Sequence, residues 1–505
     1  MIHVGEEYNG HQKFDADAVV IGSGAGGAVM AKELQEKGHS VILLEEGGNL
    51  MTRDYGQDTI ESFRDLYRDN GATVAIGRPP VPFPIGRVLG GTTAVNSGTC
   101  FRTPDIILRK WKLEWNLDDI GPQQMEPYFD RVEKIYSVNP VHEGNMGKNG
   151  EIFLRGAKEL GYSCGPLNRN QNENCTGCGI CTLGCPSDGK RHTALNYIPM
   201  ASEMGCEVFC DFRVEKIKTR GGRATGVSGS ILNRKSGKRR TTFEVDAKIV
   251  VLSAGAIHTP MLLQRNRLAN SSGEVGKNLR LHPGIRVYAM MDETVNGWLG
   301  VPQGVYVDEF FDEGIMLEGI FVGPLLSAPA MPYFGKKGKD LMFNYPKVAA
   351  FGAMVHDVTR GRVRPGPMRK PFITYWLEKN DLRKAIKAIA YTSEIFFAAG
   401  AKKVFPTISW LPEINSVKEI TEILTGPVKA SDMEMMAFHP MGTCRMGTDP
   451  ERSVVGPYCE SFDVPGLFVA DASIFPSCLG VNPMESIMAF SNRTADYIHE
   501  EVLGK

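Results

Sequence analysis

Residues 15–48 read DADAVVIGSGAGGAVMAKELQEKGHSVILLEEGG, and this stretch decides the fold of the first part of the chain. A run of small and β-branched residues ends in a glycine turn. A helical pattern follows and ends at Gly38, and a second apolar run ends at Glu45. The order predicts a strand, a turn, a helix and a second strand, with the glycines where the first strand meets the helix.

Gly22, Gly24 and Gly27 form the pattern G-x-G-x-x-G in this turn. Such glycines allow a tight turn, close approach of a pyrophosphate to the backbone, and close packing of helix on strand. The helix N-terminus offers free N–H groups to phosphates. Glu45 lies 21 residues beyond Gly24, where an acid suits a ribose hydroxyl. The pattern predicts a dinucleotide site, with a purely structural turn as the alternative, and it does not separate NAD from FAD.

Composition limits the remaining possibilities. The 505 residues predict two or three domains, and 42% hydrophobic with 23% charged residues is ordinary for a globular protein. A net charge of -1 gives no electrostatic reason to expect nucleic acid as a partner. Since we find neither a signal peptide nor an apolar run of about 18 residues, we expect a cytoplasmic protein without a transmembrane segment. Eleven cysteines are then expected to be reduced or metal-bound.

Five further motifs follow in order. They are GRVLGGTTAVNSGTCFRTP (86–104), LSAGAIHTPMLLQRN (252–266), VGKNLRLHPG (275–284), HPMGTCRMG (439–447) and GLFVADASIFPSCLGVNPMESIMAF (466–490). Together they resemble the glucose–methanol–choline (GMC) oxidoreductases. The resemblance implies FAD as cofactor and a mixed α/β fold, with a Rossmann-like FAD-binding domain and a substrate-binding domain built on an antiparallel sheet.

The same resemblance suggests a division of the chain. We expect the FAD-binding domain over 1–285, including a cysteine-rich segment at 164–192. The substrate-binding domain is expected over 286–426, where glycine turns give way to aromatic residues, Met and Pro. Residues 427–505 are expected to return to the FAD-binding domain with the catalytic pair.

Two groups of residues match FAD-contacting positions of the family. Paired glycines and small hydroxylic residues let backbone N–H groups approach an anionic ligand, although GGTT alone could be an ordinary turn. Val95 stands where some relatives attach FAD covalently through histidine, so we expect non-covalent FAD. The matching residues are Gly90, Gly91, Thr92, Asn96 and Ser97 in one loop, and Asp471 and Ala472 at the end of a late strand.

His439 and Asn482 match the catalytic pair of the family. Oxidation of an alcohol needs a group that takes the hydroxyl proton, and histidine titrates in a suitable range. Asn cannot take a proton at neutral pH, but its amide can orient the substrate oxygen. We therefore predict His439 as base and Asn482 as its positioning partner, against the alternative that either is structural.

The segment CTGCGICTLGCP carries Cys175, Cys178, Cys181 and Cys185 with the spacing of a ferredoxin run. A disulfide is disfavoured by the compartment, whereas zinc and an unmetallated remnant remain alternatives. The spacing favours an iron–sulfur cluster, 4Fe-4S or 3Fe-4S, with Cys206 or Cys210 as a possible further ligand. Flavoprotein subunits of gluconate and glucose dehydrogenases, which resemble GMC enzymes, carry a similar stretch.

A cluster passes one electron at a time. We therefore expect an FAD-dependent alcohol dehydrogenase that delivers electrons to a one-electron acceptor protein or a quinone. The alternatives are a sugar or polyol dehydrogenase, an O₂-dependent alcohol oxidase with a non-functional cysteine run, and an electron-transfer module without an alcohol substrate. Met and aromatic residues in 316–333 and 341–355 suggest an apolar pocket for a hydrophobic alcohol, or plain core packing.

Overall fold

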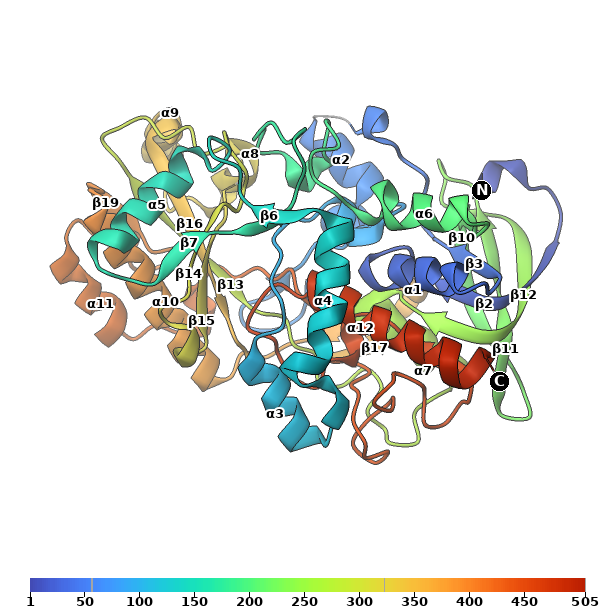
Figure 1. Ribbon diagram of the computed structural model, residues 1–505. Helices are drawn as coiled ribbons and strands as arrows, with labels where there is room; N and C mark the ends of the chain where they lie inside the picture. Colours follow the sequence, from blue (N-terminus) through green and yellow to red (C-terminus); the bar gives the residue numbers. More distant parts are fainter. Residues whose placement is uncertain (56–57, 322, 505) are drawn as a thin grey trace.

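The computed structural model describes residues 1–55, 58–321 and 323–504. Two large β-sheets organise the molecule, and Figure 1 shows them side by side with helices on their outer faces. The strands of the N-terminal half lie mostly in one sheet and those after residue 284 mostly in the other.

The first sheet is mixed and contains the glycine turn. Its parallel part has the order β1-β9-β3-β2-β12, with β20 on the other side of β12, and an antiparallel hairpin extends it through β11 to β10. Its central strands are buried on both faces, as parallel strands covered by helices are. The strands are β1 (Ile2–Val4), β2 (Gln12–Ile21), β3 (Val41–Leu44), β9 (Glu207–Cys210), β10 (Phe212–Arg220), β11 (Arg223–Leu232), β12 (Arg239–Leu252) and β20 (Leu467–Val469).

Helix α1 (Ala25–Glu36) follows β2 directly and confirms the predicted strand–turn–helix–strand unit. It is almost entirely buried because α12 (Met484–Tyr497) and α6 (Tyr197–Glu203) pack against it. Helix α4 (Pro122–Tyr136) packs on α12 (Figure 1). Helix α12 thus covers α1, the helix that starts within the glycine motif.

The second sheet is antiparallel throughout, in the order β19-β13-β16-β15-β14-β7. Helices α10 (Lys379–Ala398) and α5 (Gly147–Glu159) cover it, and the Phe153 and Phe351 rings stack between α5 and β16. Its strands are β7 (Cys164–Pro166), β13 (Gly284–Met290), β14 (Val305–Val307), β15 (Ile315–Gly319), β16 (Val348–Val355) and β19 (Lys403–Phe405).

Short elements connect and flank the two sheets. The helices are α2 (Thr59–Leu66), α3 (Asp105–Trp115), α7 (Gly255–Asn266), α8 (Pro324–Ser327), α9 (Gly335–Phe343) and α11 (Ile420–Thr425). The two-stranded pairs are β4 (Val74–Ala75) with β5 (Val81–Pro82), β6 (Val138–Pro140) with β8 (Asn168–Asn170), and β17 (Arg362–Pro365) with β18 (Pro371–Thr374).

The predicted fold class is confirmed: a mixed α/β fold with a Rossmann-like sheet and an antiparallel sheet. The chain crosses between the sheets earlier than the sequence division suggests, since β7 pairs with β14 and supplies an edge to the second sheet. Pairing there covers backbone groups that β14 would otherwise leave open. The division at residues 285 and 426 stays a prediction. Within the described ranges, we find no helix with the length and apolar character needed to cross a membrane.

Candidate active site

A cavity of about 1230 Å³ extends from the glycine turn to the second sheet. Gly24 and Asp471 line it from the first sheet, and Glu318 and Met354 line it from the second. His439 and Asn482, predicted from sequence, also line it. The cavity is therefore the place where a ligand bound at the glycine turn can meet the predicted catalytic pair.

The glycines of the turn differ in what surrounds them. A Cβ on Gly27 would lie 1.8 Å from the Gly22 carbonyl oxygen, and one on Gly26 would lie 1.7 Å from the Ala470 carbonyl oxygen. Gly22 has φ +100°, which favours glycine. A Cβ on Gly24 would meet no protein atom within 4 Å, and this residue caps α1 at the cavity wall. The space at Gly24 fits a phosphate at a helix N-terminus.

Glu45 fixes the turn from the end of β3. Its Oε2 accepts hydrogen bonds from the Ser23 N–H at 3.0 Å and from Ser23 Oγ at 2.6 Å, while its Oε1 accepts from the Gly47 N–H at 2.7 Å. Glu45 lines the cavity but is almost buried. The carboxylate therefore already holds the glycine turn in shape, and the ribose contact predicted for it stays a prediction.

The GGTT loop lies directly beside the glycine turn. A Cβ on Gly91 would lie 3.0 Å from the Gly24 Cα, and the Gly90 N–H donates to Ser23 Oγ at 2.9 Å. Thr92 Oγ1 accepts from the Gly86 N–H. Two glycine-rich segments far apart in sequence thus form one small-residue wall of the cavity.

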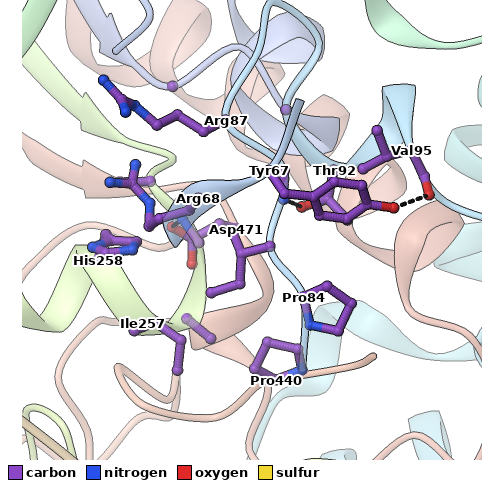
Figure 2. Close-up of a pocket in the computed structure, with 18 of the residues that line it drawn as sticks. Tyr67, Arg68, Pro84, Arg87, Thr92, Val95, Ile257, His258, Pro440 and Asp471 are labelled. Atoms are coloured by element: carbon purple, nitrogen blue, oxygen red, sulfur yellow. Dashed lines mark hydrogen bonds between the residues drawn. The ribbon is translucent and has the colours of Figure 1, made fainter. Parts of the chain in front are cut away.

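The other loop residues make protein contacts of their own. Asn96 Nδ2 lies 3.0 Å from Met484 Sδ, and Ser97 Oγ donates to Gln303 Oε1. Both residues line the cavity. Val95 is buried, and its carbonyl accepts from the Tyr67 hydroxyl, as Figure 2 shows.

Asp471 lines the cavity near the glycine turn and lies just after the end of β20. Its Oδ2 accepts from Thr259 Oγ1 at 2.5 Å and from the Gly255 N–H at 2.9 Å, which ties it to the start of α7. Burial raises the pKa of this carboxyl, although these hydrogen bonds act in the opposite direction. Asp471 and Ala472 both line the cavity as predicted neighbours of the glycine turn.

A basic wall faces this region and was not found from sequence. Figure 2 shows Arg68, Arg87 and His258 on one side of the cavity, opposite Thr92 and Val95. Arg68 pairs with Glu46 at 2.9 Å. Burial would raise the pKa of Glu46, but Arg68 and Arg87 outweigh it and hold the pKa at about 2. Arg87 and His258 belong to the motifs at 86–104 and 252–266, but only the fold shows that they lie beside Arg68.

The structure brings His439 and Asn482 together. His439 Nε2 lies 3.3 Å from Asn482 Nδ2, and His439 Nδ1 lies 3.3 Å from Nδ1 of His282. The backbone N–H of Gly480 donates to His282 Nε2 at 3.0 Å. Burial lowers the pKa of His439 to about 3 and that of His282 well below its usual value, so both rings are neutral.

His282, Asp357 and Cys478 bring their ligand atoms within 4.8 Å of one another. Hydrogen bonds already use this group: Asp357 Oδ2 accepts from the Tyr375 hydroxyl at 2.6 Å and from the Leu281 N–H at 3.1 Å. We therefore interpret the three side chains as a buried support for the His282 backbone and ring.

Glu318 completes the polar end of the cavity and was missed by sequence reasoning. Its Oε2 accepts from Asn482 Nδ2 at 3.3 Å and from Gln303 Nε2 at 2.9 Å. Gln303 Oε1 in turn accepts from Ser97 and Thr99. The available signal was a single charge in the otherwise apolar run GIMLEGIF, because an unpaired carboxylate is rarely buried without a function.

The apolar stretches predicted to form a pocket contribute to the cavity in part. Ile320, Phe321 and Met354 line it, together with Leu326 and Met436. Other residues of these stretches, such as Leu317 and Phe351, lie in the core of the second sheet. Both interpretations of the stretches thus apply, each to different residues.

The cysteine run gives no support to the predicted iron–sulfur cluster. Cys181 Sγ accepts from Arg169 at 3.5 Å, and Cys185 Sγ accepts from the Lys190 N–H at 3.3 Å. Cys178 is exposed. Across the described ranges, no three of the four sulfur atoms gather within 4.8 Å of one another. The relatives described below give the cluster no support either, so the electron outlet predicted at Cys175, Cys178, Cys181 and Cys185 stays a prediction without support.

Lys190, next to this run, has a role that its sequence context did not indicate. Its buried ammonium donates to the carbonyls of Asn96 at 2.7 Å, Ala94 at 2.9 Å and Cys181 at 3.1 Å. Burial lowers its pKa to about 8. The cysteine segment is therefore a structural clamp on the loop that carries Gly91 to Ser97.

The cavity runs from a G-x-G-x-x-G turn to a His–Asn pair. Comparison with known proteins identifies the class of protein that carries this arrangement. The GMC oxidoreductase family matches residues 63–284 and, in its C-terminal part, residues 358–491. Residues 17–81 match the pyridine nucleotide-disulphide oxidoreductases, which is consistent with the dinucleotide fold.

Individual relatives extend over most of the chain. An uncharacterized GMC-type oxidoreductase of Mycobacterium tuberculosis (strain CDC 1551 / Oshkosh) is 38% identical over 97% of this chain and 76% of its own. Long-chain-alcohol oxidase FAO4B of Arabidopsis thaliana is 29% identical over 94% of this chain and 66% of its own. A structure of Aspergillus oryzae RIB40 formate oxidase has a TM-score of 0.73 at 16% identity, covering 98% of this chain and 100% of the other.

The chain therefore belongs to the GMC oxidoreductase family. It is an enzyme of the alcohol-oxidising class that this family represents, and FAD is the cofactor typical of the family.

Proposed function

We propose that the protein oxidises the CH–OH group of an apolar alcohol to a carbonyl with FAD as the hydride acceptor. The single observation that carries the proposal is the continuity of the cavity from Gly24 to the His439–Asn482 pair. Such a cavity can hold a dinucleotide and a substrate at the same time.

The residues present fit FAD. Gly24 leaves open space at the N-terminus of α1, and Gly91 lies next to it in the cavity wall. We propose that these residues and Gly22, Glu45, Thr92, Asn96, Ser97, Asp471 and Ala472 line the FAD site, with Arg68 and Arg87 offering positive charge. Gly27 and Gly90, also predicted for this site, are not among the residues that line the cavity and shape the two turns behind it. Val95 has no group for a covalent link, so FAD is bound non-covalently in this proposal.

The chemistry supplied by bound FAD is acceptance of a hydride from the substrate carbon. His439 and Asn482 bind the substrate hydroxyl and orient it, because their nitrogen atoms meet at the same point of the cavity wall. The buried setting keeps water away and strengthens each polar contact with the substrate oxygen.

The alcohol is proposed to be hydrophobic. Ile320, Phe321, Met354 and Met436 give the cavity an apolar lining near Glu318 and His439, which favours a hydrocarbon chain over a sugar. The long-chain-alcohol oxidase among the relatives is compatible with this choice.

Without support for a cluster, we propose that electrons leave the flavin directly for a diffusible acceptor such as O₂. This follows the alternative in which the cysteine run is non-functional in electron transfer, and the oxidase among the relatives supports it. An oxidase and a dehydrogenase can be told apart by measuring whether O₂ reoxidises the reduced flavin.

The test is anaerobic reduction of the FAD-loaded protein by primary alcohols of increasing chain length, followed as bleaching of flavin absorbance. We expect reduction by apolar alcohols, faster than by glucose or glycerol, and hydrogen peroxide on later exposure to O₂. A protein reduced only by sugars would contradict the substrate class. Reduced flavin that is stable in O₂ but reoxidised by a dye would contradict the oxidase assignment.

A further inference from the structure

Residues 324–347 form a surface segment that exposes large apolar side chains to solvent. Phe334 is 85% exposed, Phe343 72% and Leu325 61%. A single exposed apolar residue needs no explanation, but several in one short segment mark a contact surface. The segment contains α8 and α9, which Figure 1 shows along the same edge of the molecule. We call this segment the α8–α9 surface.

A small core of its own holds the α8–α9 surface in place. Met331, Leu341 and Tyr345 are buried in one apolar cluster beneath it. The Tyr345 hydroxyl donates a hydrogen bond to Ser327 Oγ at 2.7 Å, which links the residues after α9 to the end of α8. The exposed rings therefore belong to the outer face of a folded segment.

Positive charge surrounds the exposed apolar residues. Lys337 Nζ lies 5.5 Å from the centre of the Tyr333 ring, and Lys339 Nζ lies 5.5 Å from the centre of the Phe343 ring. Glu413 acts on Lys337 from outside the segment but is already paired with Lys403 at 3.1 Å. The segment holds one acid against four lysines, all exposed: Asp340 against Lys336, Lys337, Lys339 and Lys347.

This combination fits the surface of an anionic lipid membrane. Aromatic and leucine side chains enter the boundary between headgroups and acyl chains, while lysines bind the anionic headgroups. A protein partner is less well matched, because Lys is depleted at protein interfaces. A second copy of the chain is also disfavoured, since a symmetric contact would bring the two sets of lysines together.

The α8–α9 surface adjoins the apolar end of the proposed substrate cavity. Leu326 in α8 is 37% exposed and also lines the cavity, whereas Phe321 in the same lining is buried. Phe438, next to His439, is likewise partly exposed and lines the cavity. The cavity therefore reaches the surface beside α8, on the side that carries the exposed rings.

Resting on the proposed function, we propose that the α8–α9 surface docks on anionic lipid membranes and that the hydrophobic alcohol enters the cavity from the lipid. Leu325, Phe334 and Phe343 enter the outer part of the acyl-chain layer, and the lysines bind lipid phosphates. An apolar alcohol partitions into lipid, so docking raises its concentration at the opening beside Leu326. No bond forms or breaks in this step.

The first test is sedimentation of the full FAD-loaded chain with vesicles. One set of vesicles contains phosphatidylcholine alone, and the other contains equal amounts of phosphatidylcholine and phosphatidylglycerol. Matched controls change exposed residues of the same kinds on α3, which Figure 1 shows at the opposite edge of the molecule. The surface variants are Lys336→Gln with Lys337→Gln, and Phe334→Ser with Phe343→Ser. The control variants are Lys110→Gln with Lys112→Gln, and Ile106→Ser with Leu113→Ser.

We expect wild type to bind vesicles that contain phosphatidylglycerol, and to bind phosphatidylcholine alone much more weakly. Each of the two lysine substitutions should lower the binding constant by about 5-fold, since a basic residue near an anionic surface contributes about 1 kcal/mol. The paired phenylalanine substitutions should lower it by about 10-fold or more, because buried apolar area is lost. Added salt should release wild type. Both α3 variants should bind like wild type.

The second test measures delivery of the substrate. Anaerobic flavin reduction is followed with a long-chain alcohol dissolved in the same vesicles and with a short alcohol dissolved in water. Both surface variants should be slower than wild type with the alcohol in vesicles and equal to it with the short alcohol. Thermal unfolding checks that each variant is folded, and light scattering measures the oligomeric state.

The possible results separate the proposal from its alternatives. Absence of wild-type binding to both kinds of vesicle would overturn it, and so would equal losses in the surface and α3 variants. A wild-type dimer that dissociates in Phe334→Ser with Phe343→Ser would assign the surface to a second copy instead. Vesicle binding that depends on the α8–α9 surface, without flavin reduction by any alcohol, would overturn the proposed function and leave the docking surface supported.

Discussion

Lys190 Nζ donates a hydrogen bond to the backbone carbonyl of Asn96 at 2.7 Å, across 94 residues of chain. The same ammonium binds the carbonyls of Ala94 and Cys181. One cation thus joins the cysteine segment to the loop proposed to contact FAD, which gives the segment a structural role that does not depend on a metal.

We predict that Lys190→Met destabilises the protein by about 3 kcal/mol, because several buried carbonyls lose their donor at once. FAD affinity should fall as well, since the loop from Gly91 to Ser97 loses its anchor. Urea unfolding and flavin titration check both effects. Lys248→Met is the control, because Lys248 is 70% exposed and should change stability by less than about 1 kcal/mol. Equal effects of the two substitutions would contradict the clamp.

The glycine turn offers a pair of substitutions that separates ligand binding from folding. Gly24→Ala adds a methyl group that meets no protein atom, so we expect a stability loss of no more than about 1 kcal/mol and clearly weaker FAD binding. Gly26→Ala places its methyl 1.7 Å from the Ala470 carbonyl oxygen and should destabilise the fold itself. Thermal unfolding and flavin titration are the measurements. Unchanged FAD binding in Gly24→Ala would mean that the FAD phosphates do not lie against Gly24 at the N-terminus of α1.

The pairing of His439 with Asn482 predicts that the histidine ring is needed for flavin reduction. His439→Leu removes both ring nitrogens from the cavity wall and should slow flavin reduction by roughly 100-fold or more, the scale of a general acid–base group. Anaerobic stopped-flow kinetics give the rate. Wild-type reduction rates in this variant would contradict the role proposed for His439.

The raised pKa of Glu318 also predicts a dependence of stability on pH. The folded-state pKa of about 8 lies above the ordinary value of 4.5, so the folded state holds a proton that the unfolded state releases. Its contribution to stability is full below pH 4.5 and is lost as pH rises through about 8. Each pKa unit corresponds to about 1.4 kcal/mol.

Glu318→Gln removes this titration. The free energy of unfolding of the variant, relative to wild type, should therefore be higher at about pH 9, above the folded-state pKa of about 8, than at about pH 5, near the unfolded-state pKa of 4.5. Urea unfolding of both proteins without added flavin measures it. A difference that stays constant with pH would mean that Glu318 ionises normally in the folded protein.

The cysteine run makes a prediction that is independent of the catalytic pair. Cys178→Ala and Cys185→Ser should keep alcohol-dependent flavin reduction, since neither thiol lies among the residues lining the cavity. Iron and sulfide analysis of protein purified without oxygen accompanies the kinetics. Stoichiometric iron in the wild type that is lost in these variants would support the predicted iron–sulfur cluster.

Sequence reasoning predicted well wherever a motif fixes backbone geometry. The turn at Gly22, Gly24 and Gly27 was predictable because each glycine meets a local steric demand that leaves a pattern in the sequence. His439 and Asn482 were found through their family motifs. Gly480 and His282 also lie in quoted motifs, but the motifs do not show that His282 contacts both the Gly480 N–H and the His439 ring.

The residues that sequence reasoning missed or misassigned depend on contacts between segments far apart in the chain. Glu318 and Gln303 come from the second sheet, where alternation shows which face is buried but not which side chains meet across a cavity. The cysteine spacing was real, yet similar spacing also serves a tight loop, here with Gly177, Gly179 and Gly184 at positive φ. Ligand geometry depends on where each sulfur points, and the spacing alone does not determine it.

The contact of Gly26 with the Ala470 carbonyl has a consequence for synthesis of the chain. Helix α1 and strand β12 are made early, but their partners α12 and β20 come from the last 40 residues. Because chains are made from the N-terminus, α1 and β12 expose apolar surface during synthesis until α12 and β20 have been made. Truncations that remove α12 should therefore expose and destabilise α1 and the first sheet, although these are encoded at the other end of the chain.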